Sequence, residues 1–118
     1  MNVLKARKEF GNEVYQYIQI KRVKDIAIYK QCEGVKVVSY EVHKIRMKEL
    51  KGKAFGNEKL LSQGYTHKEY LPCSNDFGKY GWSFQNLEMA ENEMNKLLGL
   101  PFTTISSEEY NLIALKYY

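Results

Sequence analysis

Glu41 and His43 are the two residues in this sequence best suited to acid–base chemistry. Side chains two positions apart on a β-strand point to the same face, so the carboxylate could orient the imidazole as a general base requires. No nucleophile motif and no serine bordered by glycines accompanies the pair. We therefore interpret His43 as an ordinary strand histidine, and we predict no catalytic residues and no enzymatic activity.

Residue types that bind zinc are spread widely along the chain: Cys32, His43, His67 and Cys73. Their gaps of ten, twenty-three and five intervening residues match none of the compact patterns that place two ligands on one turn. The glycines that could cradle a phosphate are also too far apart, at Gly52, Gly56 and Gly64. The sequence therefore predicts no metal site and no cofactor.

Basic residues gather in two places that a sheet could bring to one rim. Lys21, Arg22 and Lys24 end the first predicted strand, and a second group follows later: Lys44, Arg46, Lys48, Lys51 and Lys53. Tyrosines of neighbouring strands, Tyr40 among them, could then stack on single-stranded bases. No RNA-recognition signature is present, and a lysine edge that discourages aggregation between sheets explains the same residues.

Charge and tyrosine content also suit a protein partner. Residues 1–70 carry 15 Lys/Arg against 8 Asp/Glu, and residues 71–118 carry 3 against 6. The resulting charges of +7 and −3 give the net charge of +4 and could steer a charged partner. Ten tyrosines and a bare strand edge are compatible with β-augmentation or a homodimer.

The stretch SNDFGKYGWSF, residues 74–84, combines turn-forming residues with a short strand. Alternation sends Trp82 and Phe84 to one side, where we expect them to join the core. Phe77 and Tyr80 lie on the loop itself and are candidate contact residues for a partner. The stretch is thus interpreted mainly as a structural connection.

Length and composition indicate a single domain over residues 1–118, with residues 1–12 as a short helix or a frayed lead-in. No stretch approaches the roughly 20 apolar residues that cross a membrane. The N-terminus also lacks the apolar run of a signal peptide. We therefore expect no membrane partner, a cytoplasmic location and reduced cysteines.

The fold class that the pattern predicts is α+β, with a three- to four-stranded antiparallel meander. Strands are expected near residues 14–23, 26–32, 35–47 and 80–84. The third is longer than a small domain needs, so we expect a bulge or bend near Ser39–Glu41. Residues 48–73 suggest only a short helix or turn around Glu58–Leu61 and an edge strand or strand end before Pro72.

An amphipathic helix over residues 87–98 is expected to pack across one face of the sheet. Asn86 can cap it, and Gly99 and Pro101 end it. Its apolar stripe comprises Leu87, Ala90, Met94, Leu97 and Leu98. A second, C-terminal helix is predicted after a capping box of Ser106 and Glu109, although the apolar run there also suits a strand.

Two runs, GVKVVSYEVHKIRM (34–47) and LPCSNDFGKYGWSFQNLEMAENEM (71–94), carry a resemblance together with the basic connection between them. They resemble small uncharacterised proteins of bacterial phages and mobile elements, over about the middle two-thirds of the chain. The resemblance implies a binder or inhibitor of host machinery rather than an enzyme. We therefore expect a small non-catalytic binding module for a protein partner, with nucleic-acid binding as the alternative.

Overall fold

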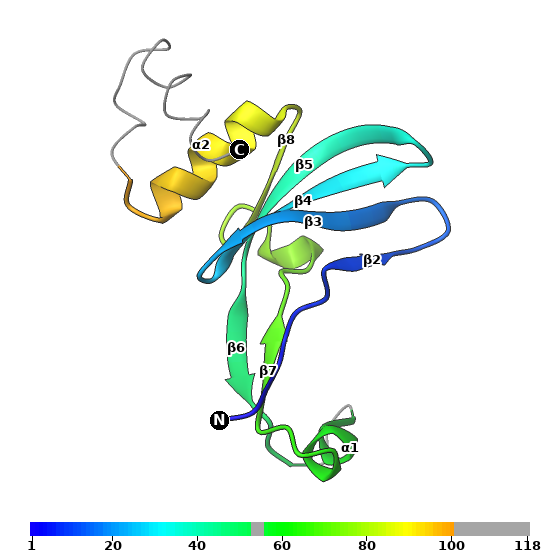
Figure 1. Cartoon of the computed structure of the whole chain (residues 1–118), viewed down its shortest axis with the longest axis vertical. Coiled ribbons are helices and arrows are strands. Elements are labelled where there is room, and N and C mark those ends of the chain that lie inside the picture. Colours follow the sequence, from blue (N-terminus) through cyan, green and yellow to red (C-terminus); the bar gives the residue numbers. More distant parts are fainter. Residues whose placement is uncertain (53–55, 101–118) are drawn as a thin grey trace.

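The computed structural model describes residues 1–52 and 56–100, and an antiparallel five-stranded sheet forms its centre (Figure 1). Its strand order is β2-β3-β4-β5-β8. The strands are β2 (Glu9–Gly11), β3 (Gln16–Val23), β4 (Ile26–Glu33), β5 (Lys36–Lys44) and β8 (Gly81–Phe84). The predicted meander is confirmed as β3-β4-β5, and its second turn uses Gly34 at a φ of 61°.

A smaller three-stranded sheet projects from the first (Figure 1). Its central strand β7 (His67–Tyr70) pairs in parallel with β1 (Val3–Leu4) and antiparallel with β6 (Arg46–Glu49). The short helix α1 (Asn57–Ser62) lies in the connection from β6 to β7 and confirms the helix predicted there. The molecule is α+β, as predicted, but it has two sheets rather than one.

Residues 1–12 are not a frayed lead-in or a helix, because they contribute a strand to each sheet. The strand β1 pairs with β7, more than sixty residues away, and β2 pairs with β3. Both strands are very short, at two and three residues, and their partners are set by tertiary contacts. The alternation of apolar and polar residues therefore does not predict β1 and β2.

The predicted third strand is also divided, because the run 35–47 is interrupted at Ile45 between β5 and β6. Ile45 is buried, and its backbone N–H donates to the carbonyl of Asp25 at 2.6 Å. The register shift within β5 lies at Val38, just before the segment where a bend was expected. The run 35–47 thus contributes one strand to each sheet. Alternation of apolar and polar residues does not show where such a run changes from one sheet to the other.

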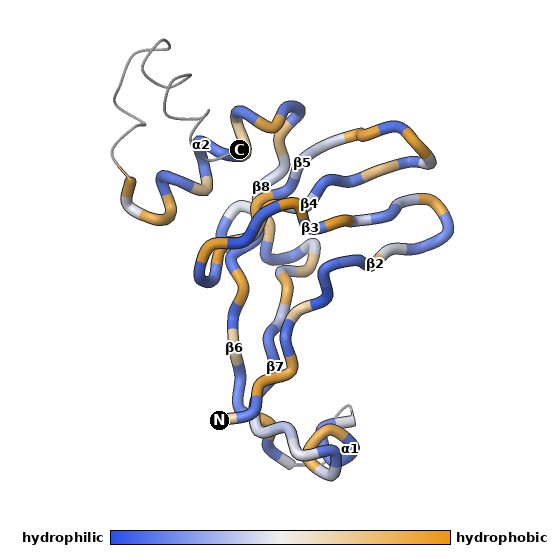
Figure 2. The backbone as a smooth tube through the Cα atoms, viewed as in Figure 1, coloured by the Kyte–Doolittle hydropathy of each residue, from blue (hydrophilic) through white to orange (hydrophobic). Residues whose placement is uncertain are grey.

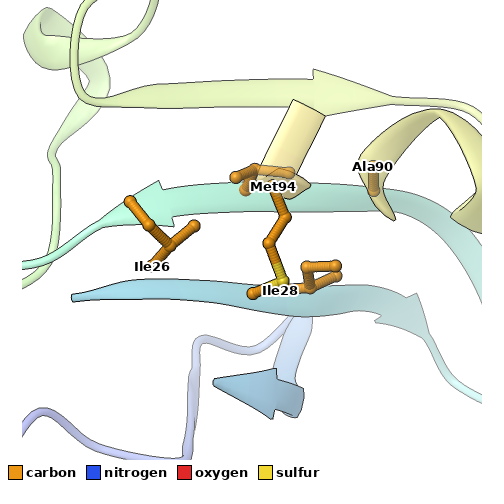
Figure 3. Packing of buried hydrophobic residues seen from close by; sticks show 5 residues of the cluster. Ile26, Ile28, Ala90 and Met94 are labelled. Atoms are coloured by element: carbon orange, nitrogen blue, oxygen red, sulfur yellow. The ribbon is translucent and has the colours of Figure 1, made fainter. Parts of the chain in front are cut away.

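Helix α2 (Leu87–Leu97) covers one face of the five-stranded sheet, as predicted. Asn86 caps it, since the side-chain Oδ1 accepts a hydrogen bond from the Met89 backbone N–H at 2.8 Å. Met94 reaches from the helix to Ile28 in the core (Figure 3). The buried members of this cluster are Ile26, Ile28, Val42, Ala90 and Met94.

Trp82 and Phe84 pack half-buried against the same cluster, so the expected inward side of β8 is confirmed. The opposite face of the sheet has a second buried cluster of Ala27, Tyr29 and Ile45, covered by the N-terminal segment and Leu71. The C-terminal helix predicted after Ser106 lies outside the described residues. No helix among residues 1–52 and 56–100 is long and apolar enough to span a membrane.

We predict that Met94→Ala lowers the free energy of unfolding by about 2–5 kcal/mol, because it removes a fully buried side chain and leaves a cavity. Met89→Ala is the matched control, since Met89 lies on the same helix and is 50% exposed. Urea denaturation of both variants measures the difference. Equal effects of the two substitutions would contradict the packing of α2 on this face.

Candidate functional site

The basic residues of the predicted rim do not form one surface. Three of them each pair with a carboxylate: Lys21 with Glu91 of α2, Arg22 with Glu69 of β7, and Arg46 with Asp76. Because these carboxylates belong to different elements, the three cations point to different parts of the molecule. Their positive charge is also largely balanced locally.

Arg22 and Glu69 join the two sheets through a bidentate ion pair. The two guanidinium nitrogens Nη1 and Nη2 donate to the two carboxylate oxygens at 2.8 and 2.7 Å. Glu69 also accepts from the Ala6 backbone N–H at 2.9 Å. The hydrogen bonds from Arg22 are the main reason that the pKa of Glu69 falls to about 2. Arg22 is therefore a structural residue in this fold.

Arg46 holds the loop that precedes β8. Its Nη2 donates to Asp76 Oδ2 at 2.8 Å, and its guanidinium carbon lies 4.0 Å from the centre of the Tyr80 ring. The backbone N–H and then the thiol of Cys73 also donate to Asp76, and together with Arg46 they lower the pKa of Asp76. Arg46 and Tyr80 thus position the loop rather than presenting themselves to a partner.

Lys53 lies outside the described residues, and the other lysines of the rim are exposed but scattered. Lys44 pairs in register with Ile26, so it does lie beside the β3–β4 turn as the meander predicts. Lys48 lies on the projecting sheet, and Lys51 contacts Glu49 at 3.5 Å. Tyr40, expected as a stacking platform, is half-buried against the α2 cluster. The predicted rim therefore has no continuous positively charged surface, and the Tyr40 ring is not fully exposed for a base to stack on.

A hollow of about 400 Å³ opens on the face of the sheet opposite α2. The sheet supplies one wall and the segment before β8 supplies the other. Its lining comprises Phe10, Tyr17, Glu41, His43, Leu71, Pro72, Ser74 and Phe77, and we call it the aromatic hollow. Of the predicted contact residues, Phe77 lies here, whereas Tyr80 does not.

Ring contacts build the walls of the aromatic hollow. Phe10 stacks on Tyr17 with centroids 4.8 Å apart, and Phe77 meets His43 edge-on at 5.9 Å. Gly81, which pairs with His43, makes room for the Phe77 ring, because a Cβ atom there would lie 2.9 Å from it. Burial and then the charge of Glu41 raise the pKa of the Tyr17 hydroxyl.

Glu41 and His43 do interact, as their shared strand face suggests. His43 Nε2 lies 2.8 Å from Glu41 Oε1, and the imidazole is only 2% exposed. His43 Nδ1 is buried and has no hydrogen-bond partner among the described residues. The pair could be predicted from the sequence, but the aromatic residues around it could not, because Phe10, Tyr17 and Phe77 come from segments far apart along the chain.

The cysteines and histidines do not assemble into a metal centre in the described part of the chain, which has no group of three such ligands, carboxylates included. Cys32 is buried on β4 and Cys73 is exposed before β8. His67 Nδ1 lies 2.8 Å from the hydroxyl oxygen of Thr66. Each residue therefore has a separate environment.

A second distinctive surface is the outer edge of β5. Strand β8 pairs only with the stretch Tyr40–His43, so the preceding part of β5 extends beyond its neighbour. Val37 and Val38 are exposed on this part of β5, and Val35 is exposed in the turn before it. Figure 2 shows a hydrophobic stretch of β5 near the tip of the β4–β5 hairpin. We call the three valines, with Lys36, the valine edge.

A shallow hollow of about 440 Å³ adjoins the valine edge on the α2 side of the sheet. Its lining comprises Ile20, Lys21, Lys30, Val37, Tyr40, Leu87 and Glu91. Lys21 and Tyr40 were predicted for a nucleic-acid rim, but both lie in this different setting. The run GVKVV indicates an apolar strand, and the shortness of β8 leaves its edge without a neighbouring strand among the described residues.

No protein-family model, no curated protein and no solved structure matches this chain. Function is therefore inferred from the two surfaces described above, the aromatic hollow and the valine edge.

We predict that Glu69→Gln lowers the free energy of unfolding at neutral pH by on the order of 2 kcal/mol, because Arg22 loses its carboxylate. The folded pKa of Glu69 is about 2 against an ordinary value of 4.5, so the stabilisation is complete above about pH 4.5 and disappears as the pH falls to about 2. The gap between wild type and variant should close over this range in denaturation experiments.

Glu49→Gln is the control, because Glu49 forms only an exposed contact with Lys51, and such pairs contribute little. A gap between wild type and Glu69→Gln that stays constant from neutral to strongly acidic pH would contradict the proposed origin of the pH dependence.

Proposed function

We propose that the protein is a small non-catalytic binding module whose valine edge pairs with an extended segment of a protein partner. The observation that carries this proposal is the mismatch in length between β5 and β8. It leaves part of an edge strand with the exposed Val37 and Val38, and with Val35 in the adjoining turn, at a position where another strand can be added.

Strand addition fits the chemistry of this edge. An edge strand offers backbone N–H and C=O groups to an incoming chain, and side-chain pockets beside it give specificity. The shallow hollow lined by Val37, Leu87 and Tyr40 lies beside the edge and provides an apolar recess for side chains of the incoming segment. Backbone pairing and apolar burial then act together.

Charge indicates what kind of segment binds. Lys36 lies within the edge and Lys30 lines the adjoining hollow, so an acidic and apolar extended segment is complementary. Pairing with a second copy of the same edge would bring two Lys36 side chains close together, which is unfavourable. We therefore favour a different protein over a homodimer.

Nucleic-acid binding remains the weaker alternative. Three of its basic residues form ion pairs with Glu69, Asp76 and Glu91, and Tyr40 is half-buried against the α2 cluster. A cytoplasmic role as an accessory or inhibitor protein of a phage or mobile element is consistent with a small binding module. That role is part of the proposal and follows from the resemblance in sequence.

Selection of a random linear peptide library on the immobilised full chain tests the proposal. We expect enrichment of acidic peptides with alternating apolar residues, and we expect Val37→Glu to weaken their binding about tenfold or more. The physical reason is that a glutamate at this position removes apolar surface from the recess and repels an acidic segment. Fluorescence anisotropy with the selected peptides measures the affinities.

Val14→Glu is the matched control, because Val14 is an exposed valine on the other hairpin, between β2 and β3. Equal loss in both variants, or no enriched peptide, would refute the valine edge as the site. Size-exclusion chromatography tests the homodimer, and a concentration-dependent dimer disrupted by Val37→Glu would replace the proposed partner with a second copy. Tight binding to single-stranded nucleic acid with a steep loss on adding salt would favour the alternative instead.

A further inference from the structure

The aromatic hollow is an unassigned site on the face of the sheet opposite α2, away from the valine edge. Its volume of about 400 Å³ lies within the range of small-molecule sites, which combine apolar walls with a few polar groups. Apolar and aromatic side chains dominate its lining, and the polar groups are Glu41, His43 and Ser74 apart from the Tyr17 hydroxyl. The hollow therefore has the size and composition of a ligand site.

The charge of the hollow is opposite to that of the chain. The chain carries a net charge of +4, yet among the described residues no lysine or arginine lines this space, and Glu41 is the one carboxylate that does. Glu41 is largely buried, with 13% of its side chain exposed, so its charge is poorly screened by water. A cationic ligand is the complement of such a site.

His43 holds the carboxylate of Glu41 in place. A carboxylate only accepts hydrogen bonds, so the Nε2 atom of His43, 2.8 Å away, is the donor to it. The Nδ1 atom of the same ring is buried and has no hydrogen-bond partner among the described residues. The geometry thus fixes the position of Glu41 within the hollow.

Besides the carboxylate of Glu41, the aromatic rings of the hollow can also bind a cation. Aromatic faces attract cations through their electron-rich π-systems, and this attraction grows when the cation leaves water. Phe10, Tyr17 and Phe77 all line the hollow beside the carboxylate. Rings combined with a single acid select a bulky, weakly hydrated cation over a small metal ion, which requires several oxygen ligands.

We propose that the aromatic hollow binds a small organic cation with a substituted ammonium group, held by Glu41 and enclosed by Phe10, Tyr17 and Phe77. Phe77 closes the hollow from the loop before β8, and the Arg46–Asp76 pair fixes that loop. The site is independent of the valine edge, which lies on the α2 side of the sheet.

Titration of the full chain with choline chloride, followed by NMR of the aromatic ring protons, tests this inference. We expect saturable shifts at Phe10, Tyr17 and Phe77. Neohexanol, the neutral alcohol in which carbon replaces the ammonium nitrogen, should bind about tenfold more weakly or not at all. Equal binding of both compounds would overturn the proposal, because it would show an apolar hollow without preference for charge.

Glu41→Gln is the decisive variant. The amide oxygen of glutamine still accepts from His43 Nε2, so the fold is kept while the charge is lost. We expect about tenfold weaker choline binding, and no change in Glu33→Gln, whose side chain is exposed at the end of β4 and outside the hollow. Unchanged choline binding in Glu41→Gln, or no saturable shift in the wild type, would overturn the site.

A second variant and a second ligand complete the test. Phe77→Leu removes a ring but keeps an apolar side chain in contact with His43, and we expect it to weaken choline binding while the chain stays folded. Trimethyl-lysine amide binding more tightly than choline would identify a modified side chain as the source of the cation, and the reverse order would identify a free small molecule. Val37→Glu should leave choline binding unchanged, which separates this site from the valine edge.

Discussion

The carboxylate of Glu69 is the interaction on which the arrangement of this molecule depends. It belongs to the small sheet, receives both guanidinium nitrogens of Arg22 from the large sheet, and accepts from the backbone of Ala6 in the N-terminal segment. The chain also passes directly from one sheet to the other at Ile45, which is buried at the junction. Because a largely buried carboxylate must be paired, the N-terminal segment and both sheets are fixed together at this point.

The two faces of the five-stranded sheet differ in the side chains that they carry. Alternation along β4 directs Ile26 and Ile28 to α2, where apolar packing excludes water. It directs Ala27 and Tyr29 to the other face, where the Tyr29 hydroxyl donates to the Arg7 carbonyl at 2.7 Å. No α-helix covers that second face in the described part of the chain, so rings and the segment before β8, with its short 3-10 helix at Ser74–Asp76, enclose it incompletely and leave the aromatic hollow.

The features predicted from sequence are those in which partners lie close along the chain. The meander, the capping residue Asn86 and the inward side of Trp82 all follow from local alternation, helical spacing or capping chemistry. The second sheet was not predicted, because β1 and β7 are short and lie more than sixty residues apart. Likewise, Arg46 looked like part of a basic rim because its carboxylate partner, Asp76, comes thirty residues later.

The same distinction explains why total charge is a poor guide to the sites of this protein. An excess of lysine and arginine predicts an anionic partner only if those side chains share one surface. Here the ion pairs of Lys21, Arg22 and Arg46 remove three of them from that role, while Glu41 lies beside His43 in a space that no described lysine or arginine lines. The sign of a site is set by the few groups that line it and by their burial. A basic chain can therefore carry a hollow suited to a cation, and the fold rather than the composition decides where each charge acts.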